Sequence, residues 1–259
     1  MSAVRGGASK MTSLPLVSAV LWAVAISVAT TQEDAKPRTD AEGNELKIWG
    51  LLVAGSKSYS NYRHQADVCH AYHVLRNHGV PDERIVVMMY DDIAYDHRNP
   101  TPGVIINHPK GKDVYAGVPK DYTGSLVTPQ NFLDILQGKK VKGGSGKVIA
   151  SGPKDHVFVY YSDHGAPGIL VFPNEYLHST QFVNVIKKMS KEKKFAKMTI
   201  YVEACHSGSM FNGLLPKNIN VYATTAANAS ENSWSCYFDT YRGAALGDLY
   251  SVSWMEDSD

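Results

Sequence analysis

The stretch from Lys197 to Gly208, KMTIYVEACHSG, joins a strand-like segment to a cysteine that small and polar residues follow. Lys197–Val202 combines β-branched, aromatic and other apolar residues, a composition typical of a buried strand. Cys205 follows Val202 after the two residues Glu203 and Ala204. A cysteine in such a place is more often a core residue than a nucleophile. The stretch therefore predicts a strand, and the role of the thiol depends on what lies beside it.

Other strand-like segments alternate with helical patterns along the chain. The strand-like segments are 47–54, 84–90, 155–161 and 219–224, and the helical patterns are 65–78, 129–136 and 179–189. Short apolar strands separated by helices indicate right-handed crossovers and a mostly parallel sheet with helices on both faces. We therefore expect an α/β fold. In such a sheet, functional side chains gather beyond the carboxyl ends of the strands.

Residues that could take part in chemistry, through a side chain or through the backbone, follow three of the predicted strands. They are Asn61, Arg63 and His64 after the first, Asp163, His164 and Gly165 after the third, and Glu203 and Cys205 after the fourth. A thiol, an imidazole and a carboxamide at one edge of a sheet are the parts of a cysteine hydrolase. Gly165 would let a backbone N–H group approach a developing oxyanion without an intervening side chain. Each residue alone has an ordinary structural explanation, so the hypothesis depends on their joint placement.

The N-terminal part of the chain has a different character. Arg5 and Lys10 precede the apolar run LPLVSAVLWAVAISVA, which is shorter than the ~18–20 apolar residues of a typical membrane span. A small-x-small cleavage site ends this run, so we predict a secretory signal peptide at 1–29. Residues 30–45 are charged and predict a flexible leader or propeptide. An N-terminal core helix is the less favoured alternative, and no other segment is apolar enough to cross a bilayer.

Composition narrows the possible functions. The 259 residues carry a formal net charge of +1, so no overall basic field indicates nucleic-acid binding. The three cysteines, Cys69, Cys205 and Cys236, leave at least one thiol unpaired within the chain, even in a compartment that permits disulfides. Asn228-Ala229-Ser230 matches the N-glycosylation sequon and indicates a surface loop.

Three further patterns point only weakly to ligands. KGGSGK at 142–147 lacks the spacing of a phosphate-binding loop. The histidines and the cysteine at 64–73 do not complete a known zinc motif. The aspartates at 91–96 do not match a calcium-binding EF-hand loop. We therefore predict neither a metal nor a cofactor.

The motifs together resemble those of the legumains, the asparaginyl endopeptidases. The similarity is carried by NYRHQAD at 61–67, SDHG at 162–165 and EACHSGSM at 203–210, and by longer blocks such as VVMMYDDIAY, GILVFPNE and YSVSWMEDSD. It covers residues 47–259. The resemblance implies a caspase-like α/β fold, a cysteine peptidase domain at 46–259, and hydrolysis of peptide bonds after Asn and less readily after Asp.

The resemblance also implies roles for single residues. By position, Cys205 is the nucleophile, His164 the general acid/base, and Asn61 the residue that orients the imidazole. Gly165 then supplies a backbone N–H group for the oxyanion. The pocket for the substrate residue before the cut is implied to contain Arg63, His64, Glu203, Ser233 and Asp248. An Asn carboxamide offers one acceptor oxygen and two donor hydrogens, which a guanidinium and carboxylates can bind.

Asp163 and His206 flank the two residues that the resemblance implies to be catalytic. Asp163 matches a position that forms a succinimide in the family. His206 is a departure, because vertebrate legumains typically carry Glu after the nucleophile. An imidazolium there could favour the thiolate, although an exposed surface side chain is the simpler interpretation.

The resemblance implies partners and a location. We expect peptide and protein substrates with Asn at the cleavage site, cystatin-type inhibitors, and an endolysosomal or vacuolar lumen or secretion as the destination. Two alternatives stay open. An amine could resolve the thioester and make the protein a peptide asparaginyl ligase, or the fold could serve a catalytically silent binding protein. Legumains continue beyond WMEDSD into a prodomain, so we expect this sequence to be either a partial one or a peptidase core without that prodomain.

Overall fold

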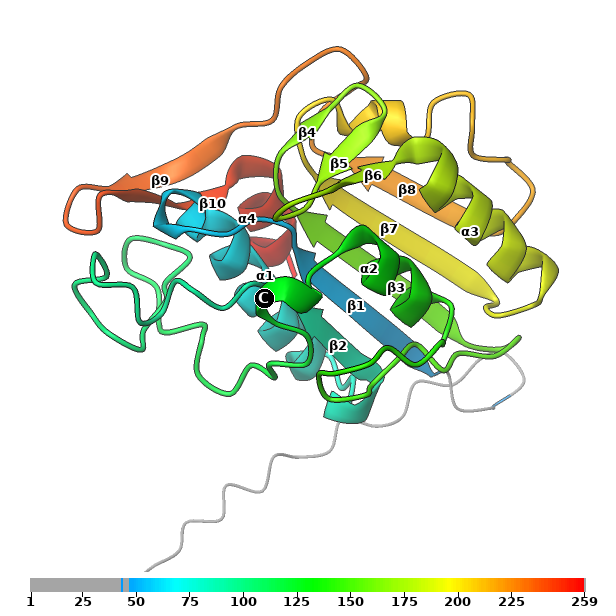
Figure 1. Cartoon of the computed structure of the whole chain (residues 1–259), viewed down its shortest axis with the longest axis horizontal. Coiled ribbons are helices and arrows are strands. Elements are labelled where there is room, and N and C mark those ends of the chain that lie inside the picture. The colour runs from blue at the N-terminus through cyan, green and yellow to red at the C-terminus, as the bar shows by residue number, and fades with distance from the viewer. Residues whose placement is uncertain (1–42, 44–46, 259) are drawn as a thin grey trace, which may run out of the picture. The chain divides into compact units, whose positions relative to one another are not determined.

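The protein is built around a five-stranded parallel sheet, seen in a computed structural model that describes Gly43 and residues 47–258 (Figure 1). The strand order is β2-β1-β3-β7-β8, and all four pairings are parallel. These strands are β1 (Ile48–Ala54), β2 (Ile85–Met88), β3 (His156–Ser162), β7 (Lys197–Glu203) and β8 (Val221–Thr225). The expected α/β fold is confirmed, and each predicted strand lies within two residues of its observed bounds.

Helices cover both faces of the sheet, as expected. On one face, α2 (Pro129–Leu136) and α3 (Ser179–Lys191) pack against the strands, and on the other face α1 (Tyr62–Asn77) and α4 (Leu249–Glu256) do so. The alternation of strand side chains divides the core accordingly. Val202 and Ala204 belong to the cluster under α2 and α3, so Glu203 between them faces the opposite side.

Local sequence signals explain where the helices begin and end. Thr128 caps α2 by accepting a hydrogen bond from the Asn131 backbone at 3.1 Å, and Pro129 occupies the first helical position, where its missing N–H group costs nothing. Gly79 ends α1 with a φ of 80°, and the following N–H group of Val80 donates to the carbonyl of Leu75 at 3.0 Å. Glycine tolerates this left-handed conformation better than other residues.

The first helix begins earlier than expected. The sequence predicts a helix from residue 65, whereas α1 begins at Tyr62 and Asn61 is its N-cap residue. The difference arises because polar residues in the first turn hide the apolar periodicity. Arg63 and His64 therefore lie on the first turn of a rigid helix rather than in a loop.

Several small elements were not predicted. They are β4 (Gly165–Ala166), β5 (Ile169–Val171), β6 (Tyr176–His178), β9 (Ser235–Asp239), β10 (Ala244–Asp248), α4, and the 3-10 helices η1 (Tyr59–Asn61), η2 (Asp82–Arg84), η3 (Gly124–Leu126) and η4 (Ser207–Met210). Strands β4 to β6 form one antiparallel sheet and β9 and β10 form another. The elements of two or three residues are too short to show a period, and the apolar residues of α4 do not follow a helical period.

The predicted signal peptide at 1–29 lies outside the described residues, as does the predicted leader at 30–45 apart from Gly43. Within the described part of the chain, no helix combines the length and the hydropathy needed to span a bilayer.

Candidate active site

The residues expected to be functional lie at the carboxyl edge of the parallel sheet. Ser162 at the end of β3 pairs with Glu203 at the end of β7. The next N–H group, of Asp163, donates to the Glu203 carbonyl at 3.1 Å. The segments carrying His164 and Cys205 therefore leave adjacent strands side by side, because neighbouring strands lie only ~4.8 Å apart.

Cys205 lies on a tight turn between β7 and η4. The next residue, His206, has a left-handed backbone with a φ of 54°. Its N–H group donates to the carbonyl of Glu231 at 2.8 Å. The sulfur of Cys205 is partly exposed and lies 3.6 Å from the hydroxyl of Ser233. The turn thus presents the thiol beside the loop that joins β8 to β9.

Gly165 brings the two segments into direct backbone contact. A Cβ atom at this position would lie 2.4 Å from the carbonyl oxygen of Cys205 and 3.0 Å from the Cβ atom of Ala204. The first distance is far shorter than two packed atoms tolerate, and the second is a tight contact. Glycine is therefore required for the close approach of the segment that follows β3 to the segment that carries the thiol.

Asn61 determines which nitrogen of His164 carries the proton. Asn61 Nδ2 donates to the carbonyl of Lys57 at 3.0 Å, so its Oδ1 is the atom that faces His164. Since this oxygen can only accept, His164 Nε2 donates to it, at 2.8 Å. The neutral ring then has an unprotonated Nδ1 that can accept a proton. The carboxamide thus orients the imidazole and selects its tautomer.

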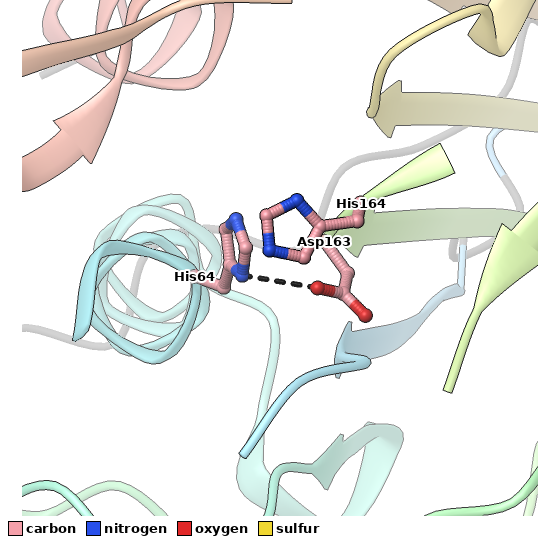
Figure 2. Close-up of side chains that lie close together, drawn as sticks. All are labelled: His64, Asp163 and His164. Carbon is pink, nitrogen blue, oxygen red and sulfur yellow. Dashed lines mark ion pairs between the residues drawn. The ribbon is translucent and has the colours of Figure 1, made fainter. Parts of the chain in front are cut away.

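His64 and Asp163 lie beside His164, and an ion-pair contact joins them (Figure 2). His64 Nδ1 is 3.1 Å from Asp163 Oδ1 and 2.7 Å from the hydroxyl of Ser56. The rings of His64 and His164 meet edge to face, with centroids 5.0 Å apart and an interplanar angle of 86°. Burial lowers the pKa of His64 to about 3 and raises the pKa of Asp163 to about 7. His64 is therefore neutral at physiological pH and supports the exposed ring in front of it.

The same three residues form a compact donor group. Within residues 47–258, only His64, Asp163 and His164 bring three potential metal-ligand atoms within 4.8 Å of one another. Both nitrogens of His64 already face protein partners, since Nε2 lies 3.6 Å from Asp248 Oδ2. Neither oxygen of Asp163 accepts a hydrogen bond within the described residues, and the absence of a metal stays a prediction.

Among the described residues, the histidines and the cysteine at 64–73 do not come together as a set of zinc ligands. Cys69 is buried and contacts Met89, and His73 lies 3.0 Å from the carbonyl of Val114. These residues of α1 therefore have separate structural surroundings.

The residues expected to recognise substrate gather between α1, β7 and β10. Arg63 Nε donates to Asp248 Oδ1 at 2.8 Å. Glu203 Oε2 accepts from both the backbone and the hydroxyl of Ser251, at 2.9 and 2.8 Å. The other oxygens, Glu203 Oε1 and Asp248 Oδ2, are buried and have no hydrogen-bond partner among the described residues. Asp248 Oδ2 lies 3.6 Å from His64 Nε2, beyond hydrogen-bond distance. Two buried oxygens that accept no hydrogen bond, beside a guanidinium, form a polar site that a ligand could complete.

Asp67 is a member of this site that the sequence analysis missed. Its side chain is completely buried and accepts hydrogen bonds from Asn107 at 2.8 Å and Ser162 at 3.2 Å. Burial, and then the carboxylates of Asp248 and Glu203, raise its pKa well above the usual value. Its position four residues after Arg63 on the same helix could have indicated it.

The comparisons with known proteins identify the family. Residues 48–259 match the model of the Peptidase C13 family, and the chain belongs to this family. It is 59% identical to the protein named legumain from Homo sapiens over 243 residues, which cover 93% of this chain and 56% of that protein. It is also 59% identical to vacuolar-processing enzyme beta-isozyme 1 from Oryza sativa subsp. japonica over 221 residues, 82% of this chain and 44% of that protein. The resemblance to legumains is confirmed.

Each match covers only part of the relative's own length. The chain spans about half the length of the curated relatives it matches. Among solved structures, caspase-1 from Spodoptera frugiperda matches with a TM-score of 0.46 and 12% identity, over 82% of this chain and 68% of that chain.

A glycine substitution tests the backbone contact beside Cys205. We expect Gly165→Ala to lower the free energy of unfolding by about 1–3 kcal/mol, the usual cost of forcing extra atoms into a packed position. Urea unfolding followed by circular dichroism measures it. Gly152→Ala is the matched control, because its new Cβ atom would have no neighbour closer than 3.9 Å. Equal stability of the two variants would contradict the steric requirement.

The buried carboxyl groups predict how stability depends on pH. Burial and then the charge of Asp248 raise the pKa of Glu203 in the folded protein. The folded state thus binds this proton more tightly than the unfolded chain does. The resulting stability is full below the unfolded pKa of ~4.3 and is lost as the pH rises through the folded pKa.

We therefore expect the melting temperature to fall between about pH 4.5 and pH 8, and Glu203→Gln to make this fall smaller. Differential scanning fluorimetry across this range measures the effect. Glu175→Gln, at an exposed position, should leave the pH dependence of the wild type unchanged. Identical curves for Glu203→Gln and the wild type would refute the assignment.

Proposed function

We propose that the chain is a cysteine endopeptidase that hydrolyses peptide bonds on the C-terminal side of Asn. Membership of the Peptidase C13 family supports this proposal. The observation that carries it is the pair of unpartnered buried oxygens of Glu203 and Asp248 beside the guanidinium of Arg63. This site lies next to a thiol and an imidazole at the same edge of the sheet.

The catalytic cycle uses the tautomer that Asn61 selects. The Cys205 thiol transfers its proton to His164 Nδ1, and the sulfur attacks the substrate carbonyl. The backbone N–H groups of Cys205 and Gly165 stabilise the oxyanion. The imidazolium then protonates the leaving amine, which leaves a thioester that water hydrolyses. Asn61 keeps the ring oriented through these steps without taking up a proton itself.

Substrate recognition follows from hydrogen-bond complementarity. The side-chain NH₂ group of Asn has two donor hydrogens, which match the free oxygens of Glu203 and Asp248. Its carbonyl oxygen accepts from Arg63, while Ser233 lines the position next to the thiol. His64 contacts this pocket through Asp248, with its Nε2 3.6 Å from Asp248 Oδ2. An apolar side chain would leave these buried groups unpaired, which costs far more than the loss of a methylene contact.

The substrates are peptides and proteins with an accessible Asn, and cystatin-type proteins are the proposed inhibitors. We place the protein in an endolysosomal or vacuolar lumen or outside the cell. The predicted signal peptide supports this location, and one relative is named a vacuolar-processing enzyme. Ligation would use the same thioester, and no feature of the described residues favours it over hydrolysis. The presence of the thiol of Cys205, the imidazole of His164 and the carboxamide of Asn61 at one edge of the sheet argues against a catalytically silent binding protein.

A nucleophile variant tests the chemistry. We expect Cys205→Ala to lower kcat/KM for a fluorogenic Asn peptide by at least about 10³-fold, because the covalent step is lost. Cys236→Ala should keep far more activity than Cys205→Ala, although that thiol pairs with Gly247 on β10, next to Asp248. In the same assay a Gln peptide should react at least about 10-fold more slowly, because its amide is displaced by one methylene. Unchanged activity of Cys205→Ala would disprove the assignment.

A pH series tests the recognition pocket. An Asp side chain in place of Asn brings a further carboxylate into a site that already holds the buried carboxyl groups of Asp67, Glu203 and Asp248, and it faces the charge of Asp248 unless it is itself protonated. Its usual pKa is ~3.9, so the ratio of kcat/KM for Asp to that for Asn should rise at least about 10-fold from pH 7 to pH 4. Paired peptides that differ only in this residue measure the ratio. A constant ratio over this range would contradict the proposed charge arrangement.

A further inference from the structure

We propose that Asn228 is a site of N-linked glycosylation and that its glycan stands at the rim of the active site. This inference rests on the location in the secretory pathway that is part of the proposed function. Asn228-Ala229-Ser230 is the one Asn-X-Ser/Thr sequence in the 259 residues whose middle residue is not proline. A glycan attached in this way therefore has a single possible position.

The local geometry suits the modification. Asn228 and Ser230 are both exposed. Asn228 Oδ1 accepts hydrogen bonds from the N–H group of Ser230 at 2.8 Å and from its hydroxyl at 3.1 Å. In the described structure, Nδ2 has no hydrogen-bond partner that a sugar would displace. A turn closed by three consecutive residues needs no distant part of the fold, so it can also form in a newly synthesised chain.

The chemical step is a glycosyl transfer from a lipid-linked oligosaccharide pyrophosphate. Asn228 Nδ2 forms a bond to C1 of the first sugar and loses one proton. The bond between C1 and the pyrophosphate oxygen breaks, and the lipid pyrophosphate leaves with the bonding electrons. No oxidation or reduction takes place.

The glycosylated loop is attached to the turn that carries the nucleophile. His206, which follows Cys205, lies 3.3 Å through its Nδ1 from the carbonyl of Ala229, and its N–H group donates to Glu231. Ala227 N donates to the hydroxyl of Ser207 at 3.2 Å. None of these contacts uses the side chain of Asn228. The loop can thus carry a glycan while it stays bound to the active-site turn.

The backbone of Asn228 is close to this turn as well. A Cβ atom at Gly208 would lie 2.9 Å from the carbonyl carbon of Asn228. The loop between β8 and β9, drawn in orange, lies beyond the carboxyl ends of the strands (Figure 1). A branched oligosaccharide at this place hinders the approach of a folded protein more than that of a short peptide. The glycan therefore favours extended peptide substrates.

Expression in eukaryotic cells of the full chain with its own N-terminus tests the modification. We expect protein from the secretory fraction to lose mass on treatment with peptide N-glycosidase, with conversion of Asn228 to Asp in the peptide map. Asn228→Gln and Ser230→Ala should abolish the mass loss, whereas Ser230→Thr should retain it. Asn232→Gln, an exposed asparagine of the same loop outside the sequon, is the matched control. An unshifted wild-type protein overturns the proposal.

A second measurement tests the position of the glycan. An endoglycosidase that leaves one sugar on Asn228 removes most of the bulk without changing the protein sequence. We expect trimming to raise kcat/KM for a folded protein substrate at least about 3-fold more than for a short Asn peptide. An equal effect on both substrates overturns the placement at the rim. Because the mass measurement requires no activity, a failure of the proposed function is distinguishable from a failure of this inference.

Discussion

The parallel pairing of β3 with β7 is the interaction on which the candidate active site depends. It places Ser162 opposite Glu203, so the residues that follow the two strands emerge next to each other. Gly165 then lies against the carbonyl group of Cys205 without a side chain between them. The imidazole and the thiol are thereby held by two segments of rigid sheet, and a rigid support is what close positioning of reacting groups requires.

The site carries an unusual concentration of buried polar groups. Asp67, Glu203 and Asp248 are all nearly inaccessible to solvent, and only one guanidinium, that of Arg63, forms an ion pair with them among the described residues. Burying charges without full compensation costs stability. The raised pKa values of Asp67 and Glu203 reduce this cost through protonation. A fold with such a pocket is therefore better suited to acidic than to neutral surroundings.

Sequence patterns predicted the long elements well and the short ones poorly. The bounds of α2 were predicted correctly because a capping threonine, a proline and an apolar face coincide. Strands β4 to β6 and the β9–β10 hairpin were missed, although β10 carries Asp248 and the chain before β9 carries Ser233. Both residues were named only through the resemblance to legumains. Their place beside Cys205 and Arg63 depends on contacts between distant segments.

The sequence by itself determined the parallel α/β architecture and singled out the side chains that are candidates for the chemistry. Strand alternation and the order of elements are local properties that the chain carries along its length. Only the tertiary structure decided the protonated nitrogen of His164, because its partner Asn61 is 103 positions away and is itself oriented by a backbone carbonyl. The tertiary structure alone also shows that Asp67 belongs to the site. Burial and electrostatic coupling arise between elements that meet only in the folded protein, and no local pattern records them.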